Sequence, residues 1–324
     1  MRIAAFEVRS DERDEFARQA ARAGVDELTL HTEKLDVEHR DLVRGYDAAL
    51  VLGMVRYDRE LLEALATRGC RVLVTRTRGM DHIDQQAALD AGVAVANTWY
   101  APDSVADFTL MLTLVALRKY KPAVYRQNVN DFSLGGLQGR TLASLTVGIM
   151  GTGAIGCAVA RRLAGFGSRV LAYDTRRNPA MEGLGTYVEL DDLLSQSDVI
   201  TFHLPATEET YHMVCHASMA KMRDGVVLVN TARASLMDVD TLIDGIESGK
   251  IGALAMDVFA GESEIYHESH VNDIIANRDM AYLRQFPNTV LTQHMAFYTR
   301  EAVEEMVSHA MDAALRLYGQ EVRD

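Results

Sequence analysis

The sequence predicts an α/β fold of two domains, each built on a parallel β-sheet. A length of 324 residues suggests about two domains of ordinary size. Short apolar runs typical of buried strands alternate with amphipathic stretches typical of helices along almost the whole chain. One long apolar segment, residues 104–118, separates this alternation into two series. We therefore expect two sheets, one from each series.

The first series is expected to contain four strands and three helices, at residues 3–8, 48–54, 72–76 and 93–97 for the strands and 11–23, 58–68 and 85–91 for the helices. Because strands that alternate with helices are joined by crossovers, this sheet should be parallel. Residues 104–118 then form a helix capped by Asp103 or Ser104. Since this helix is apolar on nearly every face, it should be buried where two domains join or at a subunit interface.

The second series is expected to contain six strands, at residues 145–150, 169–173, 199–203, 226–230, 253–256 and 289–292. Six parallel strands are what a doubly wound dinucleotide-binding sheet requires. Residues 263–287 break the alternation with a polar stretch, which we expect to be a long loop. Residues 300–317 have the pattern of a closing amphipathic helix.

Composition excludes several classes of function. The net charge of −13 argues against binding to nucleic acid or to an anionic membrane. The longest apolar run, residues 108–117, is too short to span a bilayer, and the charged N-terminal region is not a signal peptide. The three cysteines are far apart and lack metal-ligand spacing, so reduced thiols and no metal site are expected. A soluble, cytoplasmic protein is therefore predicted.

A glycine-rich turn follows the first strand of the second series. Gly151, Gly153 and Gly156 form a G-x-G-x-x-G pattern that leads from a strand into a helix. Such glycines allow a tight turn, close approach of a pyrophosphate, and close packing of helix and strand. The N–H groups around Ala154 and Ile155 would then face the phosphates at the positive end of the helix.

An acidic residue follows the next strand. Asp174 stands 18 residues beyond Gly156, where a carboxylate can bind the diol of an adenosine ribose and repel a 2′-phosphate. Arg176 and Arg177 offer the opposite possibility, since arginines at this place can bind a 2′-phosphate. We predict NAD rather than NADP. The alternative to nucleotide binding itself is a glycine turn in a sheet that binds no nucleotide.

Three more polar residues follow strands of the second series: Arg233, Asp257 and His294. Open α/β sheets place their ligands at the carboxyl ends of the strands. Hydride reduction of a ketone needs a proton donor with a pKa near the working pH, which suits His294. Glu262 is the candidate to favour its imidazolium form, and Arg233 the candidate to bind a carboxylate with two parallel hydrogen bonds. Alternatively, each is structural: a core histidine, an ion-pair arginine and a solvated glutamate.

These motifs make the chain resemble the D-isomer-specific 2-hydroxyacid dehydrogenases over essentially its full length. Within that family it is most similar to the D-lactate dehydrogenase branch, which includes the enzymes of vancomycin resistance. The motifs are Gly151-x-Gly153-x-x-Gly156 with Asp174, His203-Leu-Pro205, Asn230-Thr231-Ala-Arg233, Asp257 with Glu262, and His294-Met-Ala-Phe297-Tyr-Thr.

The resemblance implies a role for each matching residue. Arg233 would bind substrate, His294 paired with Glu262 would be the acid/base, and Asp257 would adjust the site near the nicotinamide. The cofactor would also meet His203, Pro205 and Thr231, and the substrate would meet the backbone at Arg78 and Gly79, the ring of Tyr100 and the ring of Phe297.

The resemblance also implies two Rossmann-like or flavodoxin-like domains with parallel sheets and a cleft between them. Residues 1–98 and 297–324 would form the substrate domain, residues 99–296 the dinucleotide-binding domain, and two chains a homodimer. The sequence departs from the family pattern at Gln293, where proline usually precedes the histidine, at Ala234 and Ala260, and at Trp99, which adds bulk beside Tyr100.

We therefore predict the reversible, NAD-dependent reduction of a small, pyruvate-like 2-oxo acid to the D-2-hydroxy acid. The D configuration rests on the resemblance alone. The small size rests partly on aromatic rings expected to crowd the substrate. One alternative is the same chemistry on bulkier aromatic or branched 2-oxo acids. An alternative of another class is a non-catalytic, NAD-sensing binding module.

Overall fold

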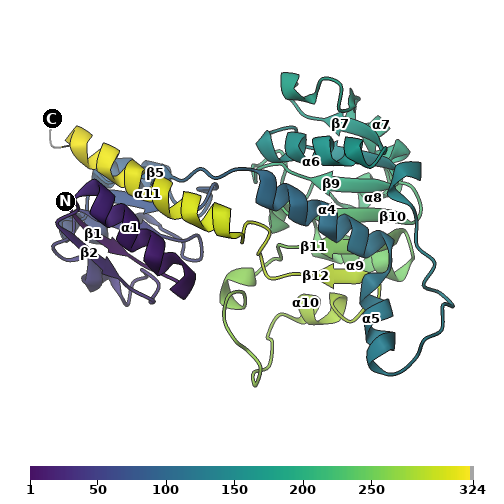
Figure 1. Cartoon of the computed structure of the whole chain (residues 1–324), viewed down its shortest axis with the longest axis horizontal. Coiled ribbons are helices and arrows are strands. Elements are labelled where there is room, and N and C mark those ends of the chain that lie inside the picture. Colours follow the sequence, from purple (N-terminus) through teal and green to yellow (C-terminus); the bar gives the residue numbers. More distant parts are fainter. Residues whose placement is uncertain (322–324) are drawn as a thin grey trace. The chain divides into compact units, whose positions relative to one another are not determined.

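The chain divides into two compact units. A computed structural model describes residues 1–321 (Figure 1). Unit 1 consists of Met1–Ala101 and Tyr298–Asp324, and unit 2 of Pro102–Phe297. The first boundary lies three residues after the one expected from the sequence, and the second lies one residue after it. The last three residues of the expected range 297–324 lie outside the described part. The predicted α/β class with two parallel sheets is confirmed.

Unit 1 is a five-stranded parallel sheet in the order β2-β1-β3-β4-β5. Its strands are β1 (Arg2–Ala5), β2 (Glu27–Leu30), β3 (Ala48–Val51), β4 (Val72–Thr75) and β5 (Ala94–Asn97). Its helices are α1 (Arg13–Ala23), α2 (Arg59–Thr67), α3 (Gln85–Ala91) and α11 (Arg300–Glu321), with short 3₁₀ turns at Ser10–Glu12 and Arg40–Val43. The strand order reverses between β1 and β3, as in a doubly wound fold.

Side chains alternate across the first sheet, so each strand supplies two cores. Ile3 and Ala5 of β1 pack in the cluster that contains residues 307–314 of α11. Ala4 and Phe6 pack on the other side with α2 and α3. In Figure 1, α11 (yellow) lies alongside α1 (purple), and both belong to unit 1. The core of unit 1 therefore combines the first hundred residues of the chain with its last helix.

A buried arginine lies at the carboxyl edge of this sheet and binds the ends of its strands. The side chain of Arg76, directly after β4, is inaccessible to solvent. Its guanidinium donates hydrogen bonds to the carbonyl oxygens of Leu50 (3.1 Å) and Phe6 (2.9 Å) and to the buried Glu12 carboxylate (3.2 Å). Because a buried charge is tolerated only when it is paired and hydrogen-bonded, these contacts fix the ends of β1 and β3 against the following turn.

Unit 2 is a seven-stranded parallel sheet in the order β12-β11-β10-β9-β6-β7-β8. Its strands are β6 (Thr146–Met150), β7 (Arg169–Tyr173), β8 (Thr186–Tyr187), β9 (Val199–Phe202), β10 (Val226–Asn230), β11 (Ile251–Met256) and β12 (Thr289–Leu291). The order reverses between β6 and β9. Ligands of open α/β sheets bind at such a reversal, outside the carboxyl ends of the strands.

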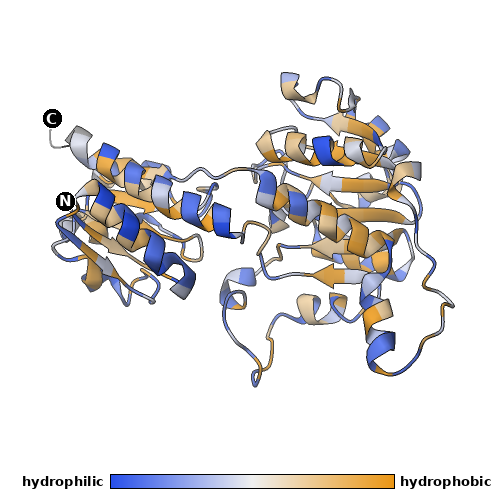
Figure 2. Ribbon diagram, in the orientation of Figure 1, coloured by the Kyte–Doolittle hydropathy of each residue, from blue (hydrophilic) through white to orange (hydrophobic). Residues whose placement is uncertain are grey.

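Helices accompany the second sheet. They are α4 (Asp103–Leu117), α5 (Tyr120–Asn128), α6 (Ala154–Gly165), α7 (Leu190–Gln196), α8 (His216–Lys221), α9 (Val239–Glu247) and α10 (Arg278–Leu283). Helix α4 packs against α6 and against β10, β11 and β12, so it is buried within unit 2. The expected place of residues 104–118 at a domain junction or a subunit interface stays a prediction. Figure 2 shows the hydrophobic residues concentrated in the strands and a largely hydrophilic α1. Within residues 1–321 no helix combines the length and apolar character that a membrane span needs.

Three expectations from the sequence were wrong in detail. The first sheet has five strands rather than four, because β2 was missed, and the second has seven rather than six, because β8 was missed. Both are edge strands, and β8 has only two residues. Residues 263–287 are not loop throughout, since α10 begins at Arg278 with Asn277 as its N-cap.

Candidate active site

The glycine turn lies at the reversal of the second sheet. Gly151 follows β6 with φ +93°, and a Cβ placed there would be 2.7 Å from the carbonyl carbon of His203, which follows β9. A Cβ at Gly156 would be 2.0 Å from the carbonyl oxygen of Gly151. A Cβ at Gly153, by contrast, would meet nothing within 4 Å. The first and third glycines thus allow close packing, and the second leaves open backbone at the start of α6, as a bound pyrophosphate requires.

Asp174 lies against this turn, directly after β7. Its Oδ2 accepts hydrogen bonds from Thr152 N (2.6 Å) and Thr152 Oγ1 (3.1 Å), and its Oδ1 accepts one from Arg176 N (3.0 Å). A carboxylate offers roughly four acceptor positions, so about one remains for a ligand hydroxyl. The open glycine backbone, the helix start at Ala154 and Ile155, and this carboxylate together fit the pyrophosphate and ribose of a dinucleotide.

The other residues expected at the cofactor follow the next two strands. His203 and Pro205 follow β9, and the His203 ring lies 3.1 Å from Thr201 Oγ1. Burial lowers the pKa of His203 to about 3, so its ring is neutral at physiological pH. Thr231 follows β10, and its hydroxyl lies 2.8 Å from that of Thr109 on α4. The structure thus brings these side chains to the same edge as the glycine turn, because the carboxyl ends of parallel strands share one edge.

His294 and Glu262 form a hydrogen-bonded pair. Nδ1 of His294 lies 2.7 Å from Oε1 of Glu262, while Oε2 of Glu262 accepts a hydrogen bond from Phe259 N (2.6 Å). Burial acts to lower the pKa of His294, but the hydrogen bond and charge of Glu262 outweigh it, so the pKa lies above its ordinary value of 6.5. With Nδ1 bonded to Glu262, Nε2 is the ring atom left to exchange a proton with a ligand.

Asp257 holds the backbone on which His294 sits. His294 has φ +52°, in the left-handed region, and its N–H donates to the Asp257 carbonyl (2.7 Å). The fully buried Asp257 carboxylate accepts hydrogen bonds from Thr292 Oγ1 (2.6 Å), Met295 N (3.0 Å) and Ala296 N (2.7 Å). Burial raises the pKa of Asp257, and these hydrogen bonds oppose the rise. The side chain therefore acts on the turn, while a contact with the nicotinamide stays a prediction.

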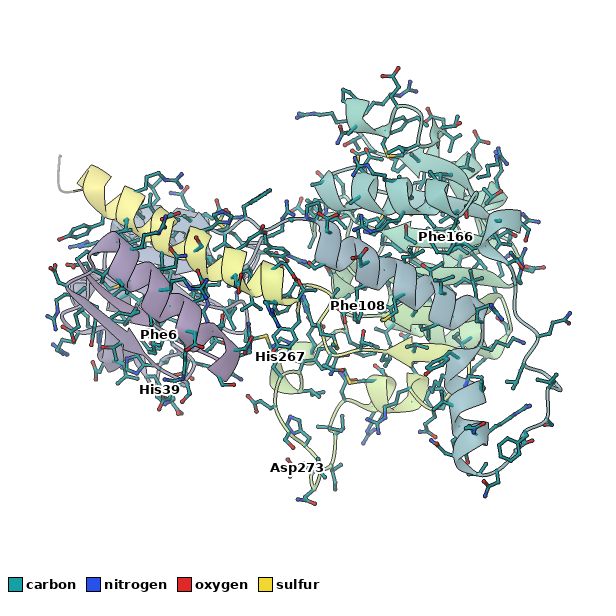
Figure 3. All side chains as sticks on the ribbon, in the orientation of Figure 1. Phe6, His39, Phe108, Phe166, His267 and Asp273 are labelled. Atoms are coloured by element: carbon teal, nitrogen blue, oxygen red, sulfur yellow. The ribbon has the colours of Figure 1, made fainter. Side chains whose placement is uncertain are left out.

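His267 makes a second connection to this turn. Its Nε2 lies 3.0 Å from the carbonyl oxygen of Gln293 and 3.3 Å from that of His294. Its ring also stands edge-on to Phe297, with centroids 6.5 Å apart. Figure 3 labels His267 on the segment that precedes α10. The turn thus has hydrogen bonds from two sides at the place where Gln293 replaces the usual proline.

Arg233 follows β10 within the same edge of the sheet. Its Nη1 donates to the Ala232 carbonyl (2.8 Å), and the Asn230 side chain bridges the turn by donating to the Arg233 carbonyl and accepting from Ala232 N, both at 2.9 Å. The positive charge of Arg233 acts to lower the pKa of His294, a smaller effect than that of Glu262. The two cationic side chains are therefore within electrostatic reach of each other.

The remaining candidate residues lie together in unit 1. Arg78 donates to the carbonyl oxygen of Tyr100 (3.1 Å), and its guanidinium carbon lies 5.5 Å from the Tyr100 ring centroid. Asn97 Nδ2 donates to the Arg78 carbonyl (2.6 Å), and Thr77 Oγ1 donates to the Gly79 carbonyl (2.7 Å). The turn after β4 and the segment after β5 thus form one connected group, in which Tyr100 is almost fully buried.

Sequence reasoning missed three residues around the His294–Glu262 pair. Thr292 supplies the hydroxyl that binds Asp257, and its position immediately before Gln293 is the only signal the sequence offers. His267 stands in a polar stretch where nothing marks it as a partner of the turn. Burial and the negative charges of Glu262 and Asp257 raise the pKa of Tyr266.

The chain is similar to several known proteins over most of its length. A family model described as D-isomer specific 2-hydroxyacid dehydrogenase, NAD binding domain, matches residues 110–296. An aromatic 2-oxoacid reductase of Clostridium sporogenes is 40% identical over 95% of this chain and 93% of its own length. A D-lactate dehydrogenase of Lactobacillus delbrueckii subsp. bulgaricus is 37% identical over 98% and 96%. The solved structure of the pyruvate reductase of Chlamydomonas reinhardtii matches with a TM-score of 0.90 and 32% identity, over 99% of this chain and 97% of that chain.

Proposed function

Because the chain belongs to the D-isomer specific 2-hydroxyacid dehydrogenase family and is an NAD-dependent enzyme, we propose that it reduces a small, pyruvate-like 2-oxo acid to the D-2-hydroxy acid. The observation that carries this proposal is the His294–Glu262 pair, which lies at the same sheet edge as Arg233 and the glycine turn. An acid, a carboxylate-binding cation and a dinucleotide site are the three parts that the reaction requires.

His294 moves the proton. NADH, when bound, would supply the hydride for C2 of the substrate. The imidazolium of His294 gives its Nε2 proton to the carbonyl oxygen, so that oxygen becomes the hydroxyl and the ring becomes neutral. Glu262, which is hydrogen-bonded to Nδ1, stabilises the imidazolium before transfer and keeps Nε2 directed to the reacting oxygen. In the reverse direction the neutral ring takes the hydroxyl proton.

Arg233 binds the carboxylate of the substrate. A guanidinium matches a carboxylate with two parallel hydrogen bonds, and its charge also polarises the neighbouring carbonyl. The Asn230 bridge across the turn fixes the Arg233 backbone. We further propose that the backbone at Arg78 and Gly79, and the rings of Tyr100 and Phe297, contact the substrate.

The preference for a pyruvate-sized substrate rests on the proposed contact with Tyr100. Within unit 1 the ring of Tyr100 is buried and held by Arg78, so it has little freedom to make room for a larger substrate. Trp99, which the sequence placed beside it as added bulk, is 54% exposed and packs against His309 of α11. The D-lactate dehydrogenase relative supports the same size.

A second candidate, an aromatic 2-oxo acid, is favoured by the similarity to the Clostridium reductase. Initial rates of NADH oxidation with pyruvate, 2-oxobutyrate and phenylpyruvate separate the two. We expect kcat/KM to be highest for pyruvate or 2-oxobutyrate, and D-lactate but not L-lactate to be oxidised. A phenylpyruvate kcat/KM well above that for pyruvate would establish the second candidate. NADH binding without turnover of any 2-oxo acid would instead indicate the NAD-sensing module.

We also propose that two copies of the chain form a homodimer in the cytoplasm. Large apolar side chains are exposed on α5 and the segment after it: Tyr120, Tyr125, Val129, Phe132 and Leu134. Several large exposed apolar side chains on neighbouring segments are typical of an interface. Light scattering at micromolar concentration should give twice the chain mass, and Phe132→Asp with Leu134→Asp should shift it toward the monomer. A monomeric wild-type chain would contradict this proposal.

A further inference from the structure

A directed chain of hydrogen bonds ends on Asp174. Asn178 N donates to Tyr187 Oη (2.8 Å), Tyr187 Oη donates to Thr152 Oγ1 (2.7 Å), and Thr152 Oγ1 donates to Asp174 Oδ2 (3.1 Å). Asn178 Nδ2 also donates to the carbonyl of Thr152 (2.7 Å). Tyr187 comes from the short edge strand β8, which pairs with β7 through Ala172. A tyrosine outside the glycine motif therefore sets the hydroxyl direction of Thr152 and, through it, the carboxylate of Asp174.

The same tyrosine engages an arginine. The guanidinium carbon of Arg177 lies 5.5 Å from the Tyr187 ring centroid, within the range of a cation–π interaction. Arg176 meets Asp174 through its backbone N–H and not through its guanidinium. Both arginines are exposed, and neither forms an ion pair within the part of the chain that the structure describes.

The charges around Asp174 set the choice between two cofactors. A 2′-phosphate is repelled by the Asp174 carboxylate and attracted by a guanidinium that is free to turn toward it. A guanidinium held on an aromatic ring keeps its N–H donors but has less freedom to turn toward a phosphate. The position of Arg177 on Tyr187 therefore weakens the attraction, and the chain of hydrogen bonds preserves the repulsion.

We propose that Tyr187 is a cofactor-specificity residue: its hydroxyl positions Asp174 through Thr152, and its ring retains Arg177, so that the protein favours NADH over NADPH. The inference rests on the proposed role of Asp174 at the ribose. Tyr187 acts through other residues and is thus a positioning residue, which predicts separate effects for its hydroxyl and its ring.

Two substitutions separate the hydroxyl from the ring. Tyr187→Phe keeps the ring and removes the hydrogen bonds to Thr152 and Asn178; Tyr187→Leu removes both features. Dissociation constants for NADH and NADPH, measured by nicotinamide fluorescence on the full chain, are the readout. Tyr187→Phe should weaken NADH binding about fivefold, the usual effect of one lost hydrogen bond, here the bond between Asp174 and the ribose. NADPH binding should stay within about twofold of the wild-type value. Tyr187→Leu should bind NADPH about fivefold more tightly than Tyr187→Phe, because Arg177 is released to form a charge-assisted contact.

Arg177→Ala tests the ring contact independently. In the Tyr187→Leu background it should abolish the gain in NADPH affinity. In the wild-type background it should leave NADPH affinity unchanged, because Tyr187 already holds the guanidinium. Weaker NADPH binding by Arg177→Ala alone would mean that Arg177 reaches the phosphate in the wild type, and would overturn the proposal even if the leucine variant failed to fold.

The control variant is Tyr282→Phe, which removes a tyrosine hydroxyl that binds Glu247 (2.5 Å) on α9. It should change neither dissociation constant. Asp174→Ala distinguishes the two levels of the argument. If it leaves the ratio of NADH to NADPH affinity unchanged, the ribose role of Asp174 is wrong. Asp174→Ala can also narrow this ratio while one of the Tyr187 variants fails its test, either because Tyr187→Phe binds NADH as tightly as the wild type or because Tyr187→Leu binds NADPH no more tightly than Tyr187→Phe. In that case the role of Asp174 stands and the proposal for Tyr187 is overturned.

Discussion

Replacing Asp257 by asparagine tests whether the His294 turn is held by a carboxylate. In the wild type, Oδ1 accepts from Thr292 Oγ1 and Met295 N, and Oδ2 accepts from Ala296 N. The amide oxygen of asparagine can keep the first two hydrogen bonds. Its NH₂ group then faces the N–H of the buried Ala296, donor against donor.

The magnitude follows from this geometry. An unsatisfied buried N–H costs about 1–3 kcal/mol, and a neutral amide recovers part of the cost of burying a charge, so we expect a net loss of about 1–2 kcal/mol. For a body the size of unit 2 this lowers Tm by roughly 2–8 °C. The loss in kcat should be larger, on the order of 10²-fold, because a displacement of about 1 Å in a reacting group has that effect.

Thermal unfolding followed by circular dichroism gives the change in Tm, and steady-state rates with NADH and pyruvate give the change in kcat. The dissociation constant of NADH should change less than threefold if Asp257 acts on the turn. Thr292→Val is the matched control: it removes one donor but leaves the charge and both backbone contacts, so its kcat should fall much less. A lower Tm with wild-type kcat would refute the reasoning, since the carboxylate would then be structural only. NADH binding weakened as strongly as kcat would instead assign Asp257 to the cofactor.

Three further substitutions address the proposed mechanism directly. His294→Gln should lower kcat by about 10²-fold or more while NADH binding, measured by fluorescence titration, stays unchanged; equal turnover would remove His294 from the reaction. Glu262 raises the pKa of His294, and reduction requires the imidazolium, so the rate falls as pH rises through that pKa; in Glu262→Gln the fall should occur at lower pH, and an unmoved pH profile would make Glu262 a loop residue. Arg233→Lys keeps the charge but loses the paired hydrogen bonds, so both KM and kcat for pyruvate should worsen; wild-type kinetics would mean that the carboxylate is bound elsewhere.

Strongly patterned elements were predicted to the residue. The bounds of β7, β10 and α3 match the expected ranges, because each is a continuous apolar or amphipathic run ended by a glycine or a polar residue. Strand β2 was missed because Glu27–Leu30 is a half-buried edge strand whose short, mixed pattern carries little periodicity.

The site shows a similar division between pattern and tertiary contact. Chemistry and resemblance suggested pairing His294 with Glu262, which are 32 residues apart, and the structure places their atoms 2.7 Å from each other. The contacts of His267 and Tyr187 had no such signal. His267 lies in a loop and Tyr187 in an edge strand, and tertiary packing fixes the path of both segments. Residue type and spacing therefore do not predict which groups these two side chains contact.

The discontinuity of unit 1 has a consequence for biosynthesis. One apolar face of β1, β3 and β4 is completed only by α11. About 200 residues separate Ala101 from Arg300, so at roughly 5–20 residues per second the ribosome needs about 10–40 s to deliver that helix. During this interval unit 2, which is contiguous in sequence, can fold. The first hundred residues meanwhile lack α11, so the apolar face of their sheet that α11 covers is exposed to solvent. We therefore expect the first hundred residues to need a chaperone until α11 has been synthesised.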